Sequence, residues 1–278
     1  MCKKAIAVVC AVWWLAVGFK VPAQEDYLDT SLPREIPATP PEGERYEAEI
    51  PDTLELVDHG NYAINQATRL WAPEWDYEQF FGIHPQTFPP LLEIGHGGLL
   101  NCGPKVIEAL PMLRAMTGST HNIDVDGKAM ASLLHITGKD GLCYQPIENR
   151  PWAFFEDFTR SVGKPYSDIF GEGRQLLAYA AWYQNDQNPV WKQLAERKMH
   201  RLLQMTMKKE DTYFFRLSRG YTPWDTDPTA GPVVPIGDHS IYDTDKGMIG
   251  TAASYIVGWT PQACAIWNNI LGGHQEAM

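Results

Sequence analysis

Three acidic stretches of this sequence combine carboxylates with aromatic or basic side chains. "RPWAFFEDF" holds Asp157, "GEGR" holds Glu172 and "GDHSIYDTD" holds Asp238. Cleavage of a glycosidic bond needs two carboxylates that face each other across the bond, one of them acting as a general acid. We therefore expect Asp157, Glu172 and Asp238 to be catalytic candidates. The structural alternatives are that Glu172 complements the dipole of a helix start and that Asp157 pairs with Arg160.

One histidine lies in a glycine-rich loop that precedes a helix. The stretch "LEIGHGGLLNCG" contains His96 between glycines, whose permissive backbone can present the imidazole to a ligand. We predict that His96 takes part in catalysis, by a hydrogen bond to a sugar hydroxyl in a hydrolase or as a proton relay in a lyase. The alternative is an imidazole that is hydrogen-bonded only to the backbone.

Aromatic and cationic side chains accompany these groups in the same parts of the chain. Flat rings pack against the apolar faces of sugars, and arginine holds carboxylates in bidentate fashion. The expected substrate-binding residues are Trp75, Tyr77, Tyr144, Arg150, Trp152, Arg174, Trp224 and His239. Tyr144 is also the candidate base for a lyase. The alternatives are rings that fill the interior and arginines that form salt bridges with neighbouring acids.

We expect neither a metal nor a cofactor, because no histidine cluster has the spacing of metal ligands. "NIDVDG" resembles the start of a calcium loop, but its twelfth position is Leu133 and the following residues continue an amphipathic helix. Outside the N-terminal signal described below, the cysteines are Cys102, Cys143 and Cys264, without CxxC spacing. A disulfide framework is therefore not expected.

Helical periodicity must position these residues, and it begins after a Pro-rich leader. A capping box of Asp52 and Glu55 predicts a first helix in the residues that follow. A second helix is predicted over residues 104–118, with a proline at its start and a kink at Pro111. A third is predicted over residues 123–137, where a glycine ends it.

The helix pairs repeat along the chain. "LLHIT" begins at residue 133 and "LLQMT" at residue 202, a spacing of 69 residues. Each unit consists of a helix, a tight turn, a second helix and an aromatic segment. A third unit begins at "GMIGTAASYIVGW" and is expected to turn at Thr260-Pro261 into another helix. A repeat of this kind predicts a stacked or ring-like helical array.

The connections in this array are unequal in length. Those over residues 72–103, 139–170 and 209–245 are long, whereas the others are tight turns. Because successive helices alternate in direction, we expect all three long connections to emerge on one rim, where helices begin. Long connections in compact domains are usually functional.

The segment "GRQLLAYAAWYQNDQNPVWKQLAERKMHRLLQM…DTYFF" resembles a helical hairpin of the (α/α)6 toroid enzymes, the six-hairpin glycosidase class. The resemblance covers about residues 53 to 272 and implies an all-α toroid with a funnel-shaped site where the inner helices begin. The class contains glycoside hydrolases, uronate-releasing enzymes and polysaccharide lyases. A full toroid has six hairpins, whereas about seven helices are expected here, so a partial toroid or a fragment is implied.

The first residues have the features of an export signal. Lys3 and Lys4 precede an apolar run over residues 5–18, and "VPA" at 21–23 is a small-residue cleavage site. We expect residues 1–23 to be a signal peptide, 24–52 an extended leader and 53–278 the helical domain, with a retained N-terminal anchor as the alternative. A formal net charge of −11 disfavours nucleic acid and anionic membranes as partners.

Together these features predict an exported, periplasmic or extracellular glycoside hydrolase that acts on a poly- or oligosaccharide through paired carboxylates. The expected partner is therefore a carbohydrate, with no membrane contact after signal cleavage. One alternative is a polysaccharide lyase or uronate-specific enzyme. The other is a non-catalytic glycan-binding or scaffold protein.

Overall fold

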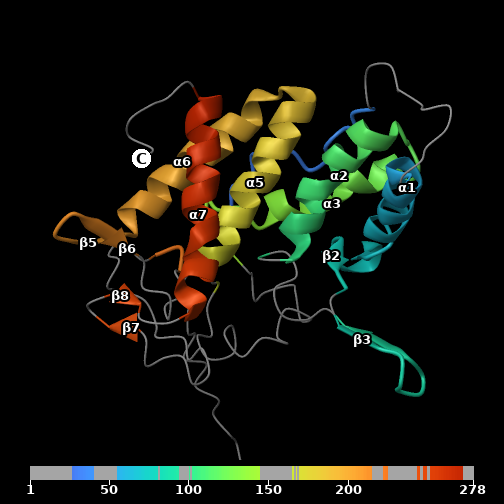
Figure 1. The fold of residues 1–278 in the computed structure, drawn as a ribbon, viewed down its shortest axis with the longest axis horizontal. Helices are drawn as coiled ribbons and strands as arrows, with labels where there is room; N and C mark the ends of the chain where they lie inside the picture. Colours follow the sequence, from blue (N-terminus) through green and yellow to red (C-terminus); the bar gives the residue numbers. More distant parts are fainter. Residues whose placement is uncertain are drawn as a thin grey trace, which may run out of the picture.

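The fold is mostly helical, in agreement with the expected all-α class (Figure 1). The computed structural model describes residues 27–40, 55–80, 82–93, 100, 102–144, 165, 167, 169–214, 222–224, 243–244, 247–248 and 251–271. Its helices are α1 (Leu56–Ala67), α2 (Gly103–Thr117), α3 (Ile123–His135), α5 (Ile169–Asp186), α6 (Pro189–Gln204) and α7 (Thr251–Ile270). None of the helices in this part of the chain has the length and apolar character needed to cross a bilayer.

The ends of the helices follow from local sequence. Helix α1 begins one residue after Glu55, whose carboxylate accepts a hydrogen bond from the Val57 amide at 2.9 Å; Glu55 is thus the N-cap itself. Pro104 lies in the first turn of α2, and Gly118 ends this helix with a left-handed φ of 66°. Asn188 caps α6 through its side chain. The predicted bounds of α2 and α3 are confirmed to within about two residues.

Four helices pack side by side in the order α1, α2, α5 and α7, while α3 packs on α2 and α6 on α5. Helices α5 and α7 run in the same direction, as their colours show in Figure 1. Two buried indole groups link neighbours in this row. Trp182 of α5 donates to the Ile107 carbonyl of α2 at 3.0 Å, and Trp267 of α7 donates to the Leu176 carbonyl of α5 at 2.8 Å.

The predicted repeat is present in the first two helix pairs. Helix α2 ends at Thr117, and α5 ends 69 residues later at Asp186. Helix α3 ends at His135, and α6 ends 69 residues later at Gln204. The aromatic segment after each pair folds back on itself. After α6 it forms the hairpin of β5 (Met207–Lys209) and β6 (Thr212–Phe214), and after α3 it forms an antiparallel bridge between Thr137 and Cys143.

The third unit differs from the prediction. The expected turn at Thr260-Pro261 is wrong, because α7 continues through both residues as one helix. Thr260, Ala263 and Trp267 are buried and recur at helical spacing, and the Trp267 indole is bonded to α5. Proline in a helix interior removes one backbone hydrogen bond and strains the preceding turn. Packing on α5 outweighs that local preference.

The long connections contain short antiparallel pairs of strands. Between α1 and α2 the pairs are β1 (Trp71–Ala72) with β2 (Glu78–Gln79), which flank the 3-10 turn η1 (Pro73–Trp75), and β3 (Gly82–His84) with β4 (Leu91–Glu93). Before α7 lies the pair of β7 (Asp243–Thr244) and β8 (Gly247–Met248). Among the described residues, each of these strands pairs only with its neighbour in a two-stranded sheet, and the fold remains mostly helical.

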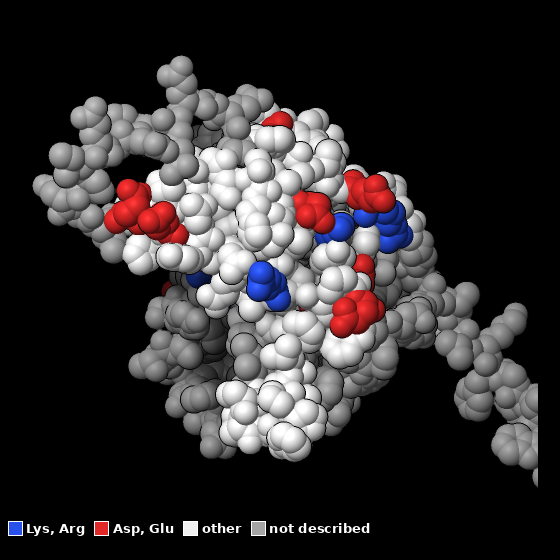
Figure 2. All heavy atoms as spheres, turned by 90° about the vertical axis from the view of Figure 1, so that its right-hand side faces the viewer, with Lys and Arg blue, Asp and Glu red and all other residues white. Residues whose placement is uncertain are grey.

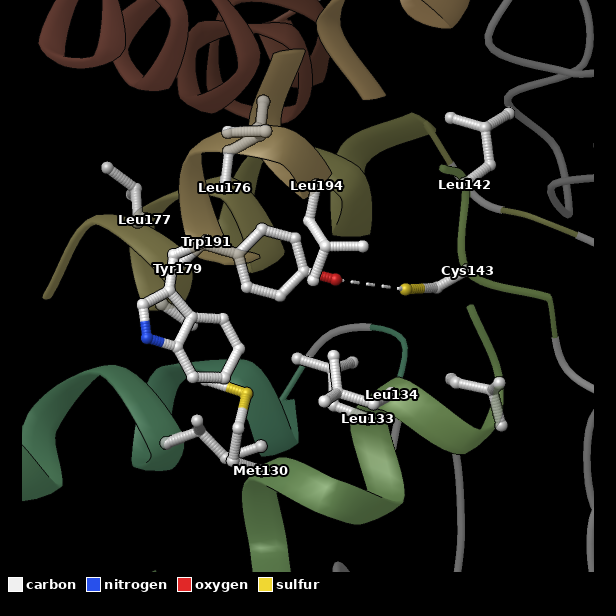
Figure 3. Packing of buried hydrophobic residues seen from close by; sticks show 14 of the residues in the cluster. Met130, Leu133, Leu134, Leu142, Cys143, Leu176, Leu177, Tyr179, Trp191 and Leu194 are labelled. Atoms are coloured by element: carbon white, nitrogen blue, oxygen red, sulfur yellow. Dashed lines mark hydrogen bonds between the residues drawn. The ribbon is translucent and has the colours of Figure 1, made fainter. Parts of the chain in front are cut away.

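The core lies where the two helix pairs meet (Figure 3). The Trp191 ring of α6 stacks on Tyr179 of α5, with centroids 6.1 Å apart, and meets the edge of Trp182 at 5.6 Å. Met130, Leu133 and Leu134 of α3 are buried against this group. Each fully buried aliphatic or aromatic side chain contributes about 1.5–3 kcal/mol to folding.

The described part of the leader contacts α3 of the first helix pair and α6 of the second. The Asp29 amide donates to the Thr137 carbonyl at 2.9 Å, and the Asp29 carboxylate binds Arg197 of α6 at 2.5 Å. Further along, the carbonyl of Ile36 lies against Gly127 of α3, at 2.1 Å from the position that a β-carbon would occupy there. Only a glycine allows the leader to approach α3 so closely.

Candidate functional site

The structure describes part of the predicted site. His96, Arg150, Trp152, Asp157, Asp238 and His239 lie outside the described residues. Glu172, Tyr144, Arg174, Trp75, Tyr77 and Trp224 lie within them. The described residues form two polar centres, one buried at the start of α5 and the other around a cavity beside α3.

Glu172 is fully buried in the first turn of α5 and forms an ion pair with Lys198 of α6. One carboxylate oxygen accepts hydrogen bonds from the Cys143 amide at 2.9 Å and the Ser167 hydroxyl at 2.6 Å, and the other accepts from Lys198. The ammonium also donates to Gln175 Oε1 at 2.6 Å and to the Cys143 thiol at 3.5 Å. Three donors on the carboxylate and three acceptors around the ammonium satisfy both charges.

These contacts determine the ionisation of the buried centre. Burial lowers the pKa of Lys198, but the interactions with Cys143 and Glu172 outweigh it and raise the pKa overall. Burial also raises the pKa of the Cys143 thiol to about 11, so that this cysteine stays protonated. The Tyr179 hydroxyl lies 3.9 Å from its sulfur (Figure 3). The contacts give Glu172 a structural task at the junction of three segments, and its catalytic role stays a prediction.

Tyr144 adjoins this centre and is fully buried. Its hydroxyl donates to Asp140 at 2.6 Å, and the same carboxylate oxygen accepts from Arg201 of α6 at 3.1 Å. Burial, followed by the charge of Asp140, raises the pKa of Tyr144. A tyrosine that abstracts a proton must reach the phenolate form, and this environment opposes that form.

The remaining described candidates have protein partners. Arg174 faces Glu108 of α2 at 3.6 Å, which agrees with the salt-bridge alternative. Trp75 lies 6.1 Å from the Phe80 ring. Trp224 is 43% exposed and meets the edge of Tyr27 at 5.9 Å, so one part of its indole remains open to solvent.

Tyr77 belongs to a cavity of about 460 Å³ beside α3. This volume is within the range of small-molecule sites. The walls come from three segments that are distant in sequence: the leader, the turn between η1 and β2, and one face of α3. The lining residues are Arg34, Glu35, Ile36, Ala38, Asp76, Tyr77, Asp124, Gly127, Lys128, Ala131 and His135.

A carboxylate and an imidazole are paired in the wall of this cavity. Nδ1 of His135 lies 3.0 and 3.1 Å from the two carboxylate oxygens of Asp76. The other ring nitrogen, Nε2, is buried and has no hydrogen-bond partner within the described part of the chain. A buried nitrogen without a partner costs about 1–3 kcal/mol, so its persistence calls for an explanation.

The turn that carries Asp76 is conformationally strained. Asp76 and Tyr77 have φ values of 55° and 53°, which are left-handed and unusual for residues other than glycine. The Tyr77 amide donates to the Ala72 carbonyl at 3.0 Å, and Asp76 is held by His135. Such consecutive strain persists where the surroundings enforce it, and it is common at binding sites.

The acidic residues at the start of α3 are engaged by cations of the chain. Asp126 binds Arg114 of α2 through two hydrogen bonds of 2.8 and 3.0 Å, and Asp124 pairs with Lys128 at 2.8 Å. Among the described residues, no group of three or more His, Cys, Asp or Glu could hold a metal ion. The calcium-like stretch forms a helix, as its amphipathic pattern predicts.

Charges of both signs lie close together on the side of the molecule that carries α1. Figure 2 shows basic and acidic side chains scattered over this face, with no extended basic patch over the part that the structure describes. A nucleic-acid interface uses a continuous basic surface. The described part of this face lacks that feature.

Sequence reasoning selected Tyr77, which lines this cavity, but did not select His135, Arg34, Glu35 or Lys128. The available signals were a histidine in the last turn of a predicted helix and a leader rich in charges. Neither signal indicates that these segments meet at Asp76. The chain matches no family model, no curated protein and no solved structure, so its site stands on this geometry alone.

Proposed function

We propose that the chain is an exported carbohydrate-active enzyme, a glycoside hydrolase built on helical hairpins of the (α/α) toroid type. The observation that carries this proposal is the recurring hairpin. Helices α2 and α5 lie in one row with α7, and α3 and α6 back this row at the same repeat spacing. Inner helices side by side with outer helices behind them are what a toroid, or part of one, requires.

The proposed catalytic apparatus is a carboxylate pair from Asp157 and Asp238, with His96 binding a sugar hydroxyl. Glu172 supports the proposal less directly, because its oxygens are occupied by three donors of the chain. It ties the start of α5 to Cys143 and Ser167, and Asp157 lies between these two residues in the sequence. The export signal predicted over residues 1–23 agrees with action on an extracellular glycan.

The lyase alternative is less well supported, because the raised pKa of Tyr144 opposes its use as a base. Sugar binding without catalysis is favoured by a specific observation, the cavity at Tyr77 and His135. Such cavities combine an aromatic ring with polar groups that orient a ligand.

A screen of polysaccharides and aryl glycosides on the purified mature protein tests the proposal. Both reducing-end release and ultraviolet absorbance are measured. New reducing ends without absorbance from an unsaturated uronate support the hydrolase. Absorbance overturns the hydrolase in favour of a lyase. If a folded, monodisperse protein gives neither signal, the hydrolase is overturned in favour of a binding protein.

Replacement of single carboxylates tests the assignment of residues. Asp157→Asn and Asp238→Asn are each expected to lower kcat by at least about a hundredfold, which is typical for loss of a general acid or base. Asp211→Asn is the matched control, because this aspartate is exposed in the β5–β6 turn. The assignment is refuted if either site variant retains the activity of the control while its circular dichroism is unchanged.

A further inference from the structure

The cavity beside α3 is enclosed by three segments of the chain, and the described residues that line it do not include the residues proposed for catalysis. Its floor is one helical face, formed by residues 124, 127, 128, 131 and 135, which spans about 16 Å along the helix axis. The leader forms one wall, and its approach to α3 depends on the absence of a side chain at Gly127. The strained turn at Asp76 and Tyr77 forms the other wall.

The histidine in this cavity has a defined hydrogen-bonding state. A carboxylate only accepts hydrogen bonds, so the contact at 3.0 Å to Asp76 places a proton on Nδ1 of His135. Nε2 is then the ring nitrogen left for a ligand, as an acceptor in the neutral ring and as a donor in the protonated one. This nitrogen is buried without a partner among the described residues, although the ring borders the cavity. A ligand hydroxyl both donates and accepts, so it supplies the missing partner in either state.

The charges around the cavity favour a neutral ligand. Lys128 is paired with Asp124 at 2.8 Å, and Asp76 faces the imidazole. The charged groups that remain at the exposed lip are Arg34 and Glu35, which have opposite signs. Apart from His135, three carboxylates line the cavity against two cations, so an acidic ligand is disfavoured while a polyol finds donors and acceptors on both walls.

We propose that this cavity is a binding site for one neutral sugar unit, with Nε2 of His135 hydrogen-bonded to a sugar hydroxyl and the Tyr77 ring contacting an apolar sugar face. The choice of a sugar rests on the proposed function, whereas the unpartnered nitrogen and the charge balance rest on the site itself. The site holds a glycan beside the helical array without taking part in bond cleavage.

Titration of the mature protein with free monosaccharides tests the proposal. The probes are glucose, galactose, mannose, xylose and arabinose, with glucuronate and galacturonate as acidic counterparts. Binding is followed by saturation transfer to the sugar protons and by the imidazole ¹⁵N shifts of the protein. At least one neutral sugar is expected to bind and to shift Nε2 of His135 more than Nδ1.

The His135→Phe variant keeps a flat ring and removes the ring nitrogens, so the affinity for that sugar is expected to fall about tenfold, the effect of one good hydrogen bond. His200→Phe makes the same change at an exposed position of α6 and is expected to bind as the wild type does. If His135→Phe fails to fold, the combined change Arg34→Ala and Glu35→Ala at the exposed lip replaces it, with an expected loss of at least about threefold.

Three results overturn the inference: no neutral sugar binds, uronates bind more tightly than neutral sugars, or binding is unchanged in the site variants. Failure of the proposed hydrolase is distinguishable, because it is measured as product release. A protein that binds sugar at His135 but cleaves nothing retains this site and loses the enzymatic proposal. If the wild type cleaves glycans and the His135→Phe variant binds the sugar as tightly as the wild type does, the enzymatic proposal is retained and this binding site is lost.

Discussion

The ion pair between Glu172 and Lys198 provides the most demanding test of this structure. In Lys198→Met, the ammonium is removed while a side chain of similar length remains, and the Glu172 carboxylate stays fully buried. Removal of one partner from a buried ion pair typically costs 3–5 kcal/mol, because the remaining charge loses its partner without regaining water. We therefore expect the free energy of unfolding at pH 7 to fall by about 3–5 kcal/mol.

The same variant has a pH signature. Burial already raises the pKa of Glu172, and Lys198 is the principal interaction that lowers it, so removal of the lysine raises the pKa further. A carboxyl whose pKa is higher in the folded state than in the unfolded state favours folding while it is protonated. The deficit of Lys198→Met should therefore be smallest below pH 4.5, the ordinary value for glutamate, and grow as the pH rises.

Urea denaturation followed by tryptophan fluorescence and far-ultraviolet circular dichroism measures both effects. Lys192→Met is the matched control, since it makes the same change on α6 at a side chain that is only partly buried; its cost should stay below about 1 kcal/mol. The double change Lys198→Met with Glu172→Gln removes both charges and should recover part of the loss. The reasoning is refuted if Lys198→Met costs no more than Lys192→Met, or if its deficit does not depend on pH.

Two further predictions concern the same junction. Gly141 has a φ of 91°, and a β-carbon there would lie 2.7 Å from the Lys198 amide nitrogen. Gly141→Ala should therefore lower the free energy of unfolding by about 2–3 kcal/mol. The control is Gly118→Ala at the end of α2, which should cost about 1 kcal/mol. Equal costs in urea denaturation would contradict this. Because burial raises the pKa of Cys143 to about 11, alkylation of this thiol at pH 8 should be at least about tenfold slower in the native protein than in urea, as measured by peptide mass spectrometry. Equal rates would show that the centre is open.

The helix ends could be predicted from the sequence because local chemistry sets them. Pro104 and Gly118 act within one turn of the chain, and the recurrence of "LLHIT" and "LLQMT" reports two equivalent hairpins. The turn at Thr260-Pro261 was predicted by the same local logic and is wrong. There the packing of the buried face of α7 on α5 outweighs the tendency of proline to end a helix. No local sequence pattern indicates that packing.

The candidate site was predictable only in part, because its contacts join residues far apart in the chain. Tyr77 could be selected as an aromatic residue in a long connection. His135 could not be selected as its neighbour, since its partner Asp76 lies 59 residues earlier. Likewise, Lys198 lies in the charged stretch "AERKMHR", which is typical of a solvated helix face, yet it is fully buried.

The sequence by itself determined the helical class, the ends of α2 and α3, and the hairpin repeat, because these depend on side-chain periodicity and on residues within a turn of one another. Only the tertiary structure decided that Glu172 is bound by Lys198, Ser167 and the Cys143 amide, and that the leader closes a cavity over His135. Burial and charge pairing are properties of what surrounds a residue, and the fold assembles those surroundings from distant segments.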